Sequence, residues 1–350
     1  MAKKKIIKNE IGIIEKQLSE KFGEGTFVGG STIIDKPRML IPCSPAIDLM
    51  TGGGIKEGNL VIITGPPKIG KTSICLDFAA TAQQPQYRPE DATEDRHVYF
   101  FNIEGRLEQR DLTGIPHLKT DPSRFTVITS HRNKILTAEE YIEIGETLIK
   151  TKPGAIFIFD SFSQLCTAGE MKANIGERYR ADSPLLLARF CRRISNILKV
   201  NDSIVMGVTH QIANQGLGMK KWSEASGQKI QYQSDVKLRA AYKSMYDGNS
   251  DTMIGQEIHM ECEWSSSGAP GVKGTTLLRY GQGIDKVYDL LILASEIGIV
   301  TKSGAWYKLG DDQLGQGKEK ACSFLREHPD IYKNIEKEYR EMMDLPNVGL

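Results

Sequence analysis

The segment that most constrains the fold is GPPKIGKTS, residues 65–73, which follows the apolar run NLVIIT and precedes the helix-like ICLDFAATA. A glycine, four residues and then Gly-Lys-Thr is the pattern of a phosphate-binding loop. Its glycines let backbone N–H groups turn toward phosphate oxygens at the start of a helix, whose dipole favours anions. Lys71 would reach the β- and γ-phosphates, and the Thr72 hydroxyl would ligate magnesium. The alternative is a chance glycine-rich turn, which the flanking strand and helix disfavour.

Short apolar runs recur along the chain and indicate buried strands. They cover residues 60–64, 97–104, 125–129, 155–160 and 203–210. Amphipathic segments of helix length separate them, among them 137–150 and 184–200. Continuous apolar strands that alternate with helices predict an α/β fold, with a mainly parallel sheet covered by helices on both faces. After residue 235 three runs lack intervening helices, as antiparallel strands at a sheet edge would: DVKLRAAY, QEIHMECEW and GTTLLRY.

Charge and cysteine usage exclude several classes of protein. The formal net charge of the 350 residues is +1, so any site for a polyanion must be local. The six cysteines are scattered and form no Cys-x-x-Cys pair, which argues against metal clusters and disulfide frameworks. No uninterrupted apolar run reaches about 18 residues, and the basic start MAKKKIIKNEIGII does not resemble a signal peptide. We therefore expect a cytoplasmic protein without a membrane partner.

Three of the predicted strands lead into polar residues that suit nucleotide chemistry. Asp160 follows AIFIF, at a strand tip where α/β sheets bind ligands, and can hold magnesium or its water. Glu104 ends HVYFFNIE and is the candidate to orient and deprotonate an attacking water. Gln211 follows SIVMGVTH, where a neutral amide can sense a γ-phosphate and shift the next loop. Each has a structural alternative, respectively a turn former, a surface carboxylate and a satisfied buried amide.

Taken in order, these features resemble the RecA recombinase family: Gly-x4-Gly-Lys-Thr, a strand-end Glu, a strand-end Asp-Ser and a strand-end Gln. Further similarity lies in IEKQLSEKFGEGT near the start and in PAIDLMTGGGIKEGNLVIITGP before the phosphate loop. Residues 280–330 are similar to the C-terminal region of bacterial RecA almost throughout. That stretch is the most specific signal, because generic ATPases lack it.

The resemblance implies an α/β fold with a RecA-like phosphate-loop ATPase core, a mostly parallel central sheet flanked by helices, and two appended parts. An N-terminal oligomerisation segment, built from a packing helix and strand, is expected over residues 1–34. The core is expected over 35–284, and a small α+β C-terminal domain over 285–350.

The resemblance also implies roles for single residues. Lys71, Glu104 and Gln211 would be catalytic, and Thr72 with Asp160 would hold Mg²⁺. Nucleotide contacts are expected from Gly65, Pro66, Pro67, Lys68, Ile69, Gly70, Lys71, Thr72, Ser73, Asp160 and Tyr280. The last of these matches an aromatic that contacts the adenine of a neighbouring subunit. The candidates for the interface between subunits are Phe27 and Tyr232.

A long polar stretch between two predicted strands, residues 212–231, is the candidate contact for DNA. Its lysines outnumber its one acid, Glu224, and Trp222 lies among them. Cations for phosphates beside an aromatic for base stacking are typical of single-strand binding. The alternative is a solvated flexible loop. The expected DNA-binding residues of this stretch are Lys220, Lys221, Trp222 and Lys229. Arg178 and Arg180, in an earlier loop, are assigned to DNA by the resemblance alone.

The chain also departs from the family pattern. Where bacterial RecA carries two lysines that reach the γ-phosphate of a neighbouring subunit, this chain has Trp264 and Ser266. Lys273 is a candidate replacement for that pair. These departures indicate a divergent member of the family, and a phage-encoded recombinase of the UvsX kind is our hypothesis.

The function that the resemblance implies is ATP-dependent recombination on DNA. The chain would polymerise on single-stranded DNA as a helical filament and exchange strands with double-stranded DNA. ATP and Mg²⁺ are the implied cofactors, and single-strand-binding and loader proteins are further candidate partners. Two other functions stay open: a ring-forming DNA helicase on the same core, and a recombination mediator that binds ATP but barely hydrolyses it. The expected location is a bacterial cytoplasm, that of the host if the chain is phage-encoded.

Overall fold

The structure is a computed structural model that describes residues 14–30, 38–90, 92–174, 182–213, 222–224, 233–246 and 253–347. The chain divides into two compact units, Met1–Arg38 and Met39–Leu350. Within the first unit, residues 14–22 are helical. The elements described below belong to the second unit.

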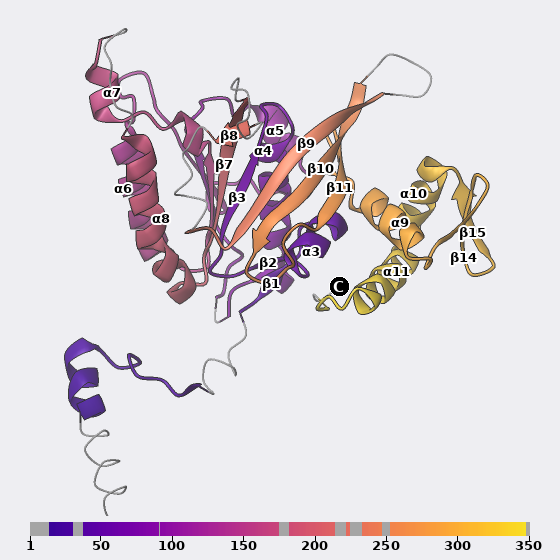
Figure 1. Cartoon of the computed structure of the whole chain (residues 1–350), viewed down its shortest axis with the longest axis horizontal. Helices are drawn as coiled ribbons and strands as arrows, with labels where there is room; N and C mark the ends of the chain where they lie inside the picture. The colour runs from indigo at the N-terminus through magenta and orange to yellow at the C-terminus, as the bar shows by residue number, and fades with distance from the viewer. Residues whose placement is uncertain are drawn as a thin grey trace, which may run out of the picture. The chain divides into compact units, whose positions relative to one another are not determined.

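A large mixed sheet organises the second unit (Figure 1). Its strands follow the order β12-β11-β10-β9-β3-β7-β6-β4-β5, and β8 pairs with β7. The strands that form its parallel part are β3 (Leu60–Gly65), β4 (Val98–Asn102), β5 (Phe125–Ile128), β6 (Ile156–Asp160) and β7 (Ile204–Ala213). The remaining strands are β8 (Trp222–Glu224), β9 (Val236–Tyr246), β10 (Met253–Ser265), β11 (Lys273–Arg279) and β12 (Gly283–Ile284).

Helices cover both faces of the parallel strands, which explains why most residues of those strands are apolar. Successive β3 residues alternate between two cores: Val61 and Ile63 belong to the core that includes α4 (Lys71–Ala82). Leu60 and Ile62 belong to the core that includes α6 (Ala138–Thr151) and α8 (Ser183–Val200). The shorter elements of this part are α3 (Pro45–Thr51), α5 (Gln109–Thr113), α7 (Ala168–Lys172), β1 (Leu40–Ile41) and β2 (Ile55–Lys56).

The predicted fold class is confirmed. Each of the five apolar runs forms a parallel strand, and the runs after residue 235 form β9, β10 and β11, which pair antiparallel with one another. The point at which they join the sheet is not visible in the sequence pattern: β9 pairs parallel with β3, the strand that leads into the phosphate loop. The antiparallel strands therefore lie directly beside that loop.

The C-terminal region packs against the core through a shared apolar cluster. It contains α9 (Lys286–Glu296), α10 (Lys318–Glu327) and α11 (Pro329–Met342). Its three-stranded sheet consists of β13 (Thr301–Ser303), β14 (Trp306–Leu309) and β15 (Asp312–Gln316). Ala46 of α3 and Leu277 of β11 belong to the same cluster as the α9 leucines. Arg340 of α11 forms a buried ion pair with Asp48 of α3, which fixes the last helix to the core.

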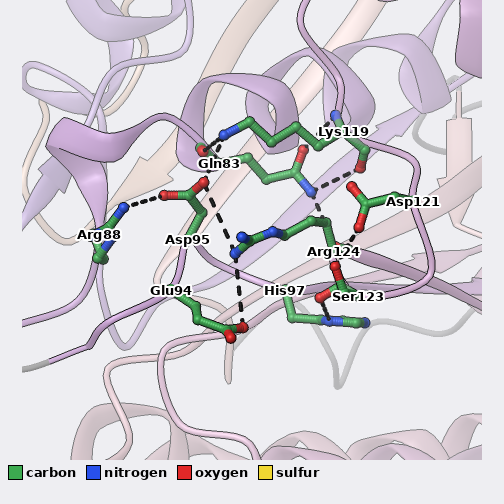
Figure 2. A network of polar contacts seen from close by, with 9 residues as sticks. All are labelled: Gln83, Arg88, Glu94, Asp95, His97, Lys119, Asp121, Ser123 and Arg124. Carbon is green, nitrogen blue, oxygen red and sulfur yellow. Dashed lines mark hydrogen bonds and ion pairs between the residues drawn. The ribbon is translucent and has the colours of Figure 1, made fainter.

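A polar network holds the end of α4 that lies farthest from the phosphate loop (Figure 2). The Gln83 side chain donates to the backbone oxygens of Lys119 and Arg124, both at 3.1 Å, and accepts from Lys119 N at 2.9 Å. Asp95 accepts hydrogen bonds from Arg88 at 2.9 Å and from Lys119 Nζ at 2.7 Å. The network joins the segments that lead into β4 and β5, at the amino ends of these strands.

Across the described ranges, no helix combines the length and the apolar character needed to cross a membrane.

Candidate nucleotide site

The carboxyl ends of neighbouring parallel strands bring the predicted catalytic residues together. Gly65, at the end of β3, lies opposite His210 of β7, and Asn102 of β4 lies opposite Asp160 of β6. Because β3, β7, β6 and β4 run parallel, their carboxyl ends meet at one edge of the sheet. The phosphate loop, Glu104, Asp160 and His210 there line a cavity of about 440 Å³.

Glycine is required at both ends of the phosphate loop. A Cβ at Gly65 would lie 2.5 Å from the Ala240 carbonyl oxygen of β9. Gly70 has φ of 81°, and a Cβ there would lie 2.5 Å from Leu278 of β11. The loop is also held from β10, where the Gln256 side chain donates to Lys68 O at 3.2 Å. The antiparallel strands therefore support the loop that opens α4.

Lys71, the first residue of α4, is buried against its own loop. Its ammonium donates to the carbonyl oxygens of Gly65 at 3.0 Å and Pro66 at 2.6 Å. Burial lowers the pKa of Lys71 to about 8. A cation at this position can offset the charge of β- and γ-phosphates, as the sequence predicts.

Thr72 and Asp160 meet at the mouth of the loop. The Thr72 hydroxyl donates to Asp160 Oδ2 at 2.6 Å. Burial raises the pKa of Asp160, and the nearby negative charge of Glu104 raises it further. A hydroxyl and a carboxylate that lie side by side next to a phosphate loop provide oxygen ligands suited to Mg²⁺. The residues present therefore fit the magnesium nucleotide that the loop motif implies.

Glu104, in the same cavity, accepts several hydrogen bonds. Its Oε1 accepts from His210 Nε2 at 2.5 Å and from Ser161 Oγ at 2.7 Å. Its Oε2 lies 3.3 Å from the guanidinium of Arg106. The hydrogen bond from His210 is the main cause that lowers the pKa of Glu104 to about 2, and the hydrogen bond from Ser161 and the positive charge of Arg106 act in the same direction. The side chain is ionised and can accept a proton from water.

His210 lies between Glu104 and Lys71. Its Nε2 faces Glu104, which can only accept, and its Nδ1 lies 3.4 Å from Lys71 Nζ, which can only donate. A neutral imidazole with its proton on Nε2 satisfies both neighbours. The backbone N–H of His210 donates to Ser163 Oγ at 2.8 Å. The sequence pattern places His210 only at the end of a strand, and the resemblance assigns the catalytic role to Gln211.

A wider cavity of about 770 Å³ adjoins the first one and shares Thr72 with it. Ser73 and Tyr280 line this cavity, and so does Arg110 of α5. The Tyr280 side chain is half exposed, and its hydroxyl donates to Met253 Sδ at 3.1 Å. An aromatic ring and a guanidinium beside a phosphate site can both stack on a nucleobase.

Comparisons with known proteins agree with this arrangement. Residues 288–344 match the family model of the RecA C-terminal domain. Protein RecA of Lactobacillus johnsonii is 26% identical over 337 residues, which cover 95% of this chain and 89% of that protein. Protein RecA of Streptococcus pneumoniae is 24% identical over 354 residues, which cover 98% of this chain and 84% of that protein. The chain is a divergent RecA-like protein.

In this RecA-like chain, the Gln211 side chain points away from the cavity that Lys71, Glu104 and His210 line. Side chains alternate along a strand, so His210 and Gln211 point to opposite faces of β7. Gln211 lines a separate cavity of about 270 Å³ with Pro66, Arg239 and Lys273. The catalytic role of Gln211 therefore stays a prediction, as does the role of Lys273 as a replacement cation.

Several predicted contacts of the RecA-like chain lie outside the described residues. They are Arg178, Arg180, Lys220, Lys221, Lys229 and Tyr232. The backbone of Trp222 is described, and it pairs with Ala213, so part of the predicted DNA loop forms an antiparallel ladder between β7 and β8. In the N-terminal unit, Phe27 has 45% of its surface exposed.

Proposed function

We propose that this RecA-like chain is a DNA-dependent ATPase that forms helical filaments on single-stranded DNA and catalyses homologous pairing and strand exchange. One observation carries the proposal: Lys71, the Thr72–Asp160 pair and Glu104 line a single cavity in a chain whose C-terminal region matches that of RecA. The cavity supplies the chemistry for ATP hydrolysis, and the C-terminal region favours a recombinase over other phosphate-loop ATPases.

Each residue of the cavity has a distinct task in hydrolysis. Lys71 offsets the negative charge of the β- and γ-phosphates, and Thr72 with Asp160 holds Mg²⁺. The ion, when bound, withdraws charge from the phosphate oxygens. Glu104 accepts the proton of the attacking water. His210 orients Glu104, because its Nε2–H donates to the carboxylate oxygen at 2.5 Å.

The remaining parts of the chain would build the filament. We propose residues 1–34 as an oligomerisation segment, with Phe27 and Tyr232 at the contact between subunits, residues 35–284 as the core and 285–350 as the C-terminal domain. Tyr280 would contact the adenine of a neighbouring subunit. ATP would favour the DNA-binding state and hydrolysis would release it, a population shift driven by differential affinity. Single-strand-binding and loader proteins are the expected accessory partners.

ATP turnover with and without single-stranded DNA tests this proposal. We expect DNA to stimulate turnover, and Lys71→Ala to abolish it because the charge that offsets the phosphates is lost. Lys152→Ala, which removes an exposed lysine outside the loop and the cavity, is the control for general damage. Turnover that is the same with and without DNA, or that survives in the Lys71 variant, would contradict the proposal.

DNA contact by the 212–231 loop has its own test. For single strands the slope of log affinity against log salt is about −0.7 per phosphate contact. Replacing Lys220 and Lys221 together by alanine should therefore flatten the slope by about 1.4 per subunit. Trp222→Ala should weaken binding by about 1–3 kcal/mol per stacked base at nearly constant slope. An unchanged slope in the double variant would mean that Lys220 and Lys221 do not contact DNA phosphates and that the DNA contact lies elsewhere.

A recombination mediator with weak ATPase activity is the second candidate, and one observation favours it. Trp264 stands where bacterial RecA has a lysine, and its indole N–H donates to Ser234 O, just before β9, at 3.1 Å. The Lys237 ammonium lies 4.9 Å from the ring centre. This position therefore offers no cation to a neighbouring subunit. Binding of ATP and DNA without DNA-stimulated turnover and without strand exchange would favour the mediator.

A further inference from the structure

The charges at the end of the phosphate cavity are not balanced by Lys71 alone. There Lys71 faces two carboxylates, Asp160 and Glu104, and a magnesium nucleoside triphosphate is itself an anion. Further cations are needed where charge develops during phosphoryl transfer. Two arginines line the same cavity, Arg106 and Arg110.

The two arginines differ in what holds them. Arg110 lies on α5 and pairs with Glu108 at 3.0 Å, and both side chains are exposed. Arg106 follows Glu104 by two residues, and its guanidinium lies 3.3 Å from Glu104 Oε2. The Arg106 side chain is 70% exposed, whereas that of Glu104 is 10% exposed. Glu104 is fixed by Ser161 and His210, so the arginine is the partner that can move.

This pair leaves Glu104 in a poor position to act as a base. Oε1 already accepts from Ser161 and His210, so Oε2 is the oxygen that can receive a proton from water. Arg106 lies against that oxygen. An ion pair with one largely exposed partner is weak, and a γ-phosphate offers the guanidinium a more highly charged acceptor.

We propose that Arg106 is a catalytic residue that leaves Glu104 for the γ-phosphate of ATP in the same subunit. The move brings a cation to the transferring group and exposes Glu104 Oε2 to the attacking water. This inference rests on the proposed ATPase function. Trp264 and Ser266 stand at the positions of the RecA lysine pair and carry no charge. Arg106 would instead supply a cation from within the subunit.

The hydrolytic step balances with these groups. The water oxygen forms a bond to the γ-phosphorus, and the bond from phosphorus to the β,γ-bridging oxygen breaks. The electron pair of that bond leaves with ADP, and the proton of the water passes to Glu104 Oε2. Arg106 donates hydrogen bonds to the γ-phosphate oxygens throughout and exchanges no proton, because a guanidinium stays protonated. With ADP bound, no γ-phosphate competes, and Arg106 remains on Glu104.

Steady-state turnover and nucleotide affinity of the full-length chain test the proposal. Arginines supplied to phosphoryl transfer contribute about 10³–10⁵ in kcat, so Arg106→Ala should lower kcat by at least about 100-fold. Its affinity for a non-hydrolysable ATP analogue should fall several-fold while its affinity for ADP stays constant. Arg106→Lys should recover part of the loss, since it keeps the charge but not the planar fork.

Two further variants separate this role from a general loss of charge. Arg110→Ala removes a cation from the same cavity and should weaken nucleotide binding without a comparable fall in kcat. Arg132→Ala, at an exposed position away from the cavity, should leave kcat unchanged. A kcat within threefold of wild type in Arg106→Ala, or an equal loss of ADP and ATP affinity, would overturn the proposal. A larger fall of kcat in Arg110→Ala than in Arg106→Ala would overturn it as well.

The failure of this inference can be told from the failure of the proposed function. If the wild-type chain hydrolyses ATP and the Arg106 variants do so equally well, only the assignment of Arg106 is wrong. If the wild-type chain neither binds nor hydrolyses ATP, the proposed ATPase function itself is wrong.

Discussion

Strand β4 has a carboxylate near each end, and the two are alike in several respects. Glu104 follows the strand, and Asp95 precedes it. Their side chains are 10% and 8% exposed, and both lie against basic partners. The pKa of each is below its usual value: His210 is the main cause for Glu104, and Lys119 followed by Arg88 for Asp95.

The surroundings of the two carboxylates differ. Glu104 shares a cavity with the phosphate loop and with residues from the ends of β6 and β7. The partners of Asp95 come from the segments before β4 and β5, and Gln83 joins the same network to the end of α4 (Figure 2). A low pKa and burial therefore do not distinguish a functional carboxylate from a structural one. Membership of a cavity that a phosphate loop also lines does distinguish the two carboxylates.

The largest expected contrast comes from Glu104→Gln. The amide keeps the shape of the side chain but cannot accept the proton of water, so turnover should fall by about 10²–10⁴ while ATP binding and filament assembly persist. Single-turnover hydrolysis, a nucleotide-binding titration and sedimentation with DNA measure these three quantities. A fall of less than about threefold, well short of that range, would mean that another residue is the base.

Two histidines allow the same comparison, one beside Glu104 and one in the region of Asp95. His210→Ala removes the donor to Glu104, and turnover should fall about ten- to hundredfold, as expected for a lost hydrogen bond to a charged group. His97 hydrogen-bonds Ser123 O at 2.9 Å and Thr126 Oγ1 at 2.8 Å in the Asp95 region. His97→Ala should leave turnover within about twofold, because these contacts only join segments of the fold. Equal losses of turnover in His210→Ala and His97→Ala would contradict the distinction between a functional and a structural carboxylate.

Asp95→Asn should show the opposite pattern from Glu104→Gln. Its partners Lys119 and Arg88 are more than a third exposed, so solvent weakens the ion pairs. The free energy of unfolding should fall by about 1 kcal/mol, with turnover unchanged at low temperature. Chemical denaturation and an ATPase assay check the two quantities. A large loss of turnover in a folded variant would show that the network reaches the active cavity.

The smallest expected effect is the pH dependence of that stability difference. Lys119 and Arg88 hold the pKa of Asp95 below its usual value of 3.8. A carboxyl whose folded-state pKa is depressed stabilises the fold above its unfolded-state pKa and loses that contribution as the pH falls. The difference in unfolding free energy between wild type and Asp95→Asn should therefore be constant near neutrality and shrink as the pH drops below the usual value. A difference that grows in acid would contradict the assignment.

Much of the site was accessible from the sequence because local patterns specify it. The glycines and Lys71–Thr72 identify the phosphate loop, and apolar runs place Asp160 and Glu104 at strand ends. The contacts of His210 and Arg106 were not accessible in that way. A shift of one residue along a strand moves a side chain to the other face, so a strand end alone cannot decide between His210 and Gln211. Only the position of the phosphate loop beside β7 shows which face is the catalytic one.

The sequence by itself determined the alternation of strands and helices, the phosphate loop and the resemblance to RecA. These follow from short-range periodicity and from residues that are adjacent in the chain. Tertiary structure alone decided that β9 joins β3, that β10 holds the loop through Gln256, and that Arg106 lies against Glu104 Oε2. It also decided that Arg340 closes on Asp48, 292 positions away. Such contacts depend on strand order and helix packing, which bring together residues whose separation in sequence carries no local signal.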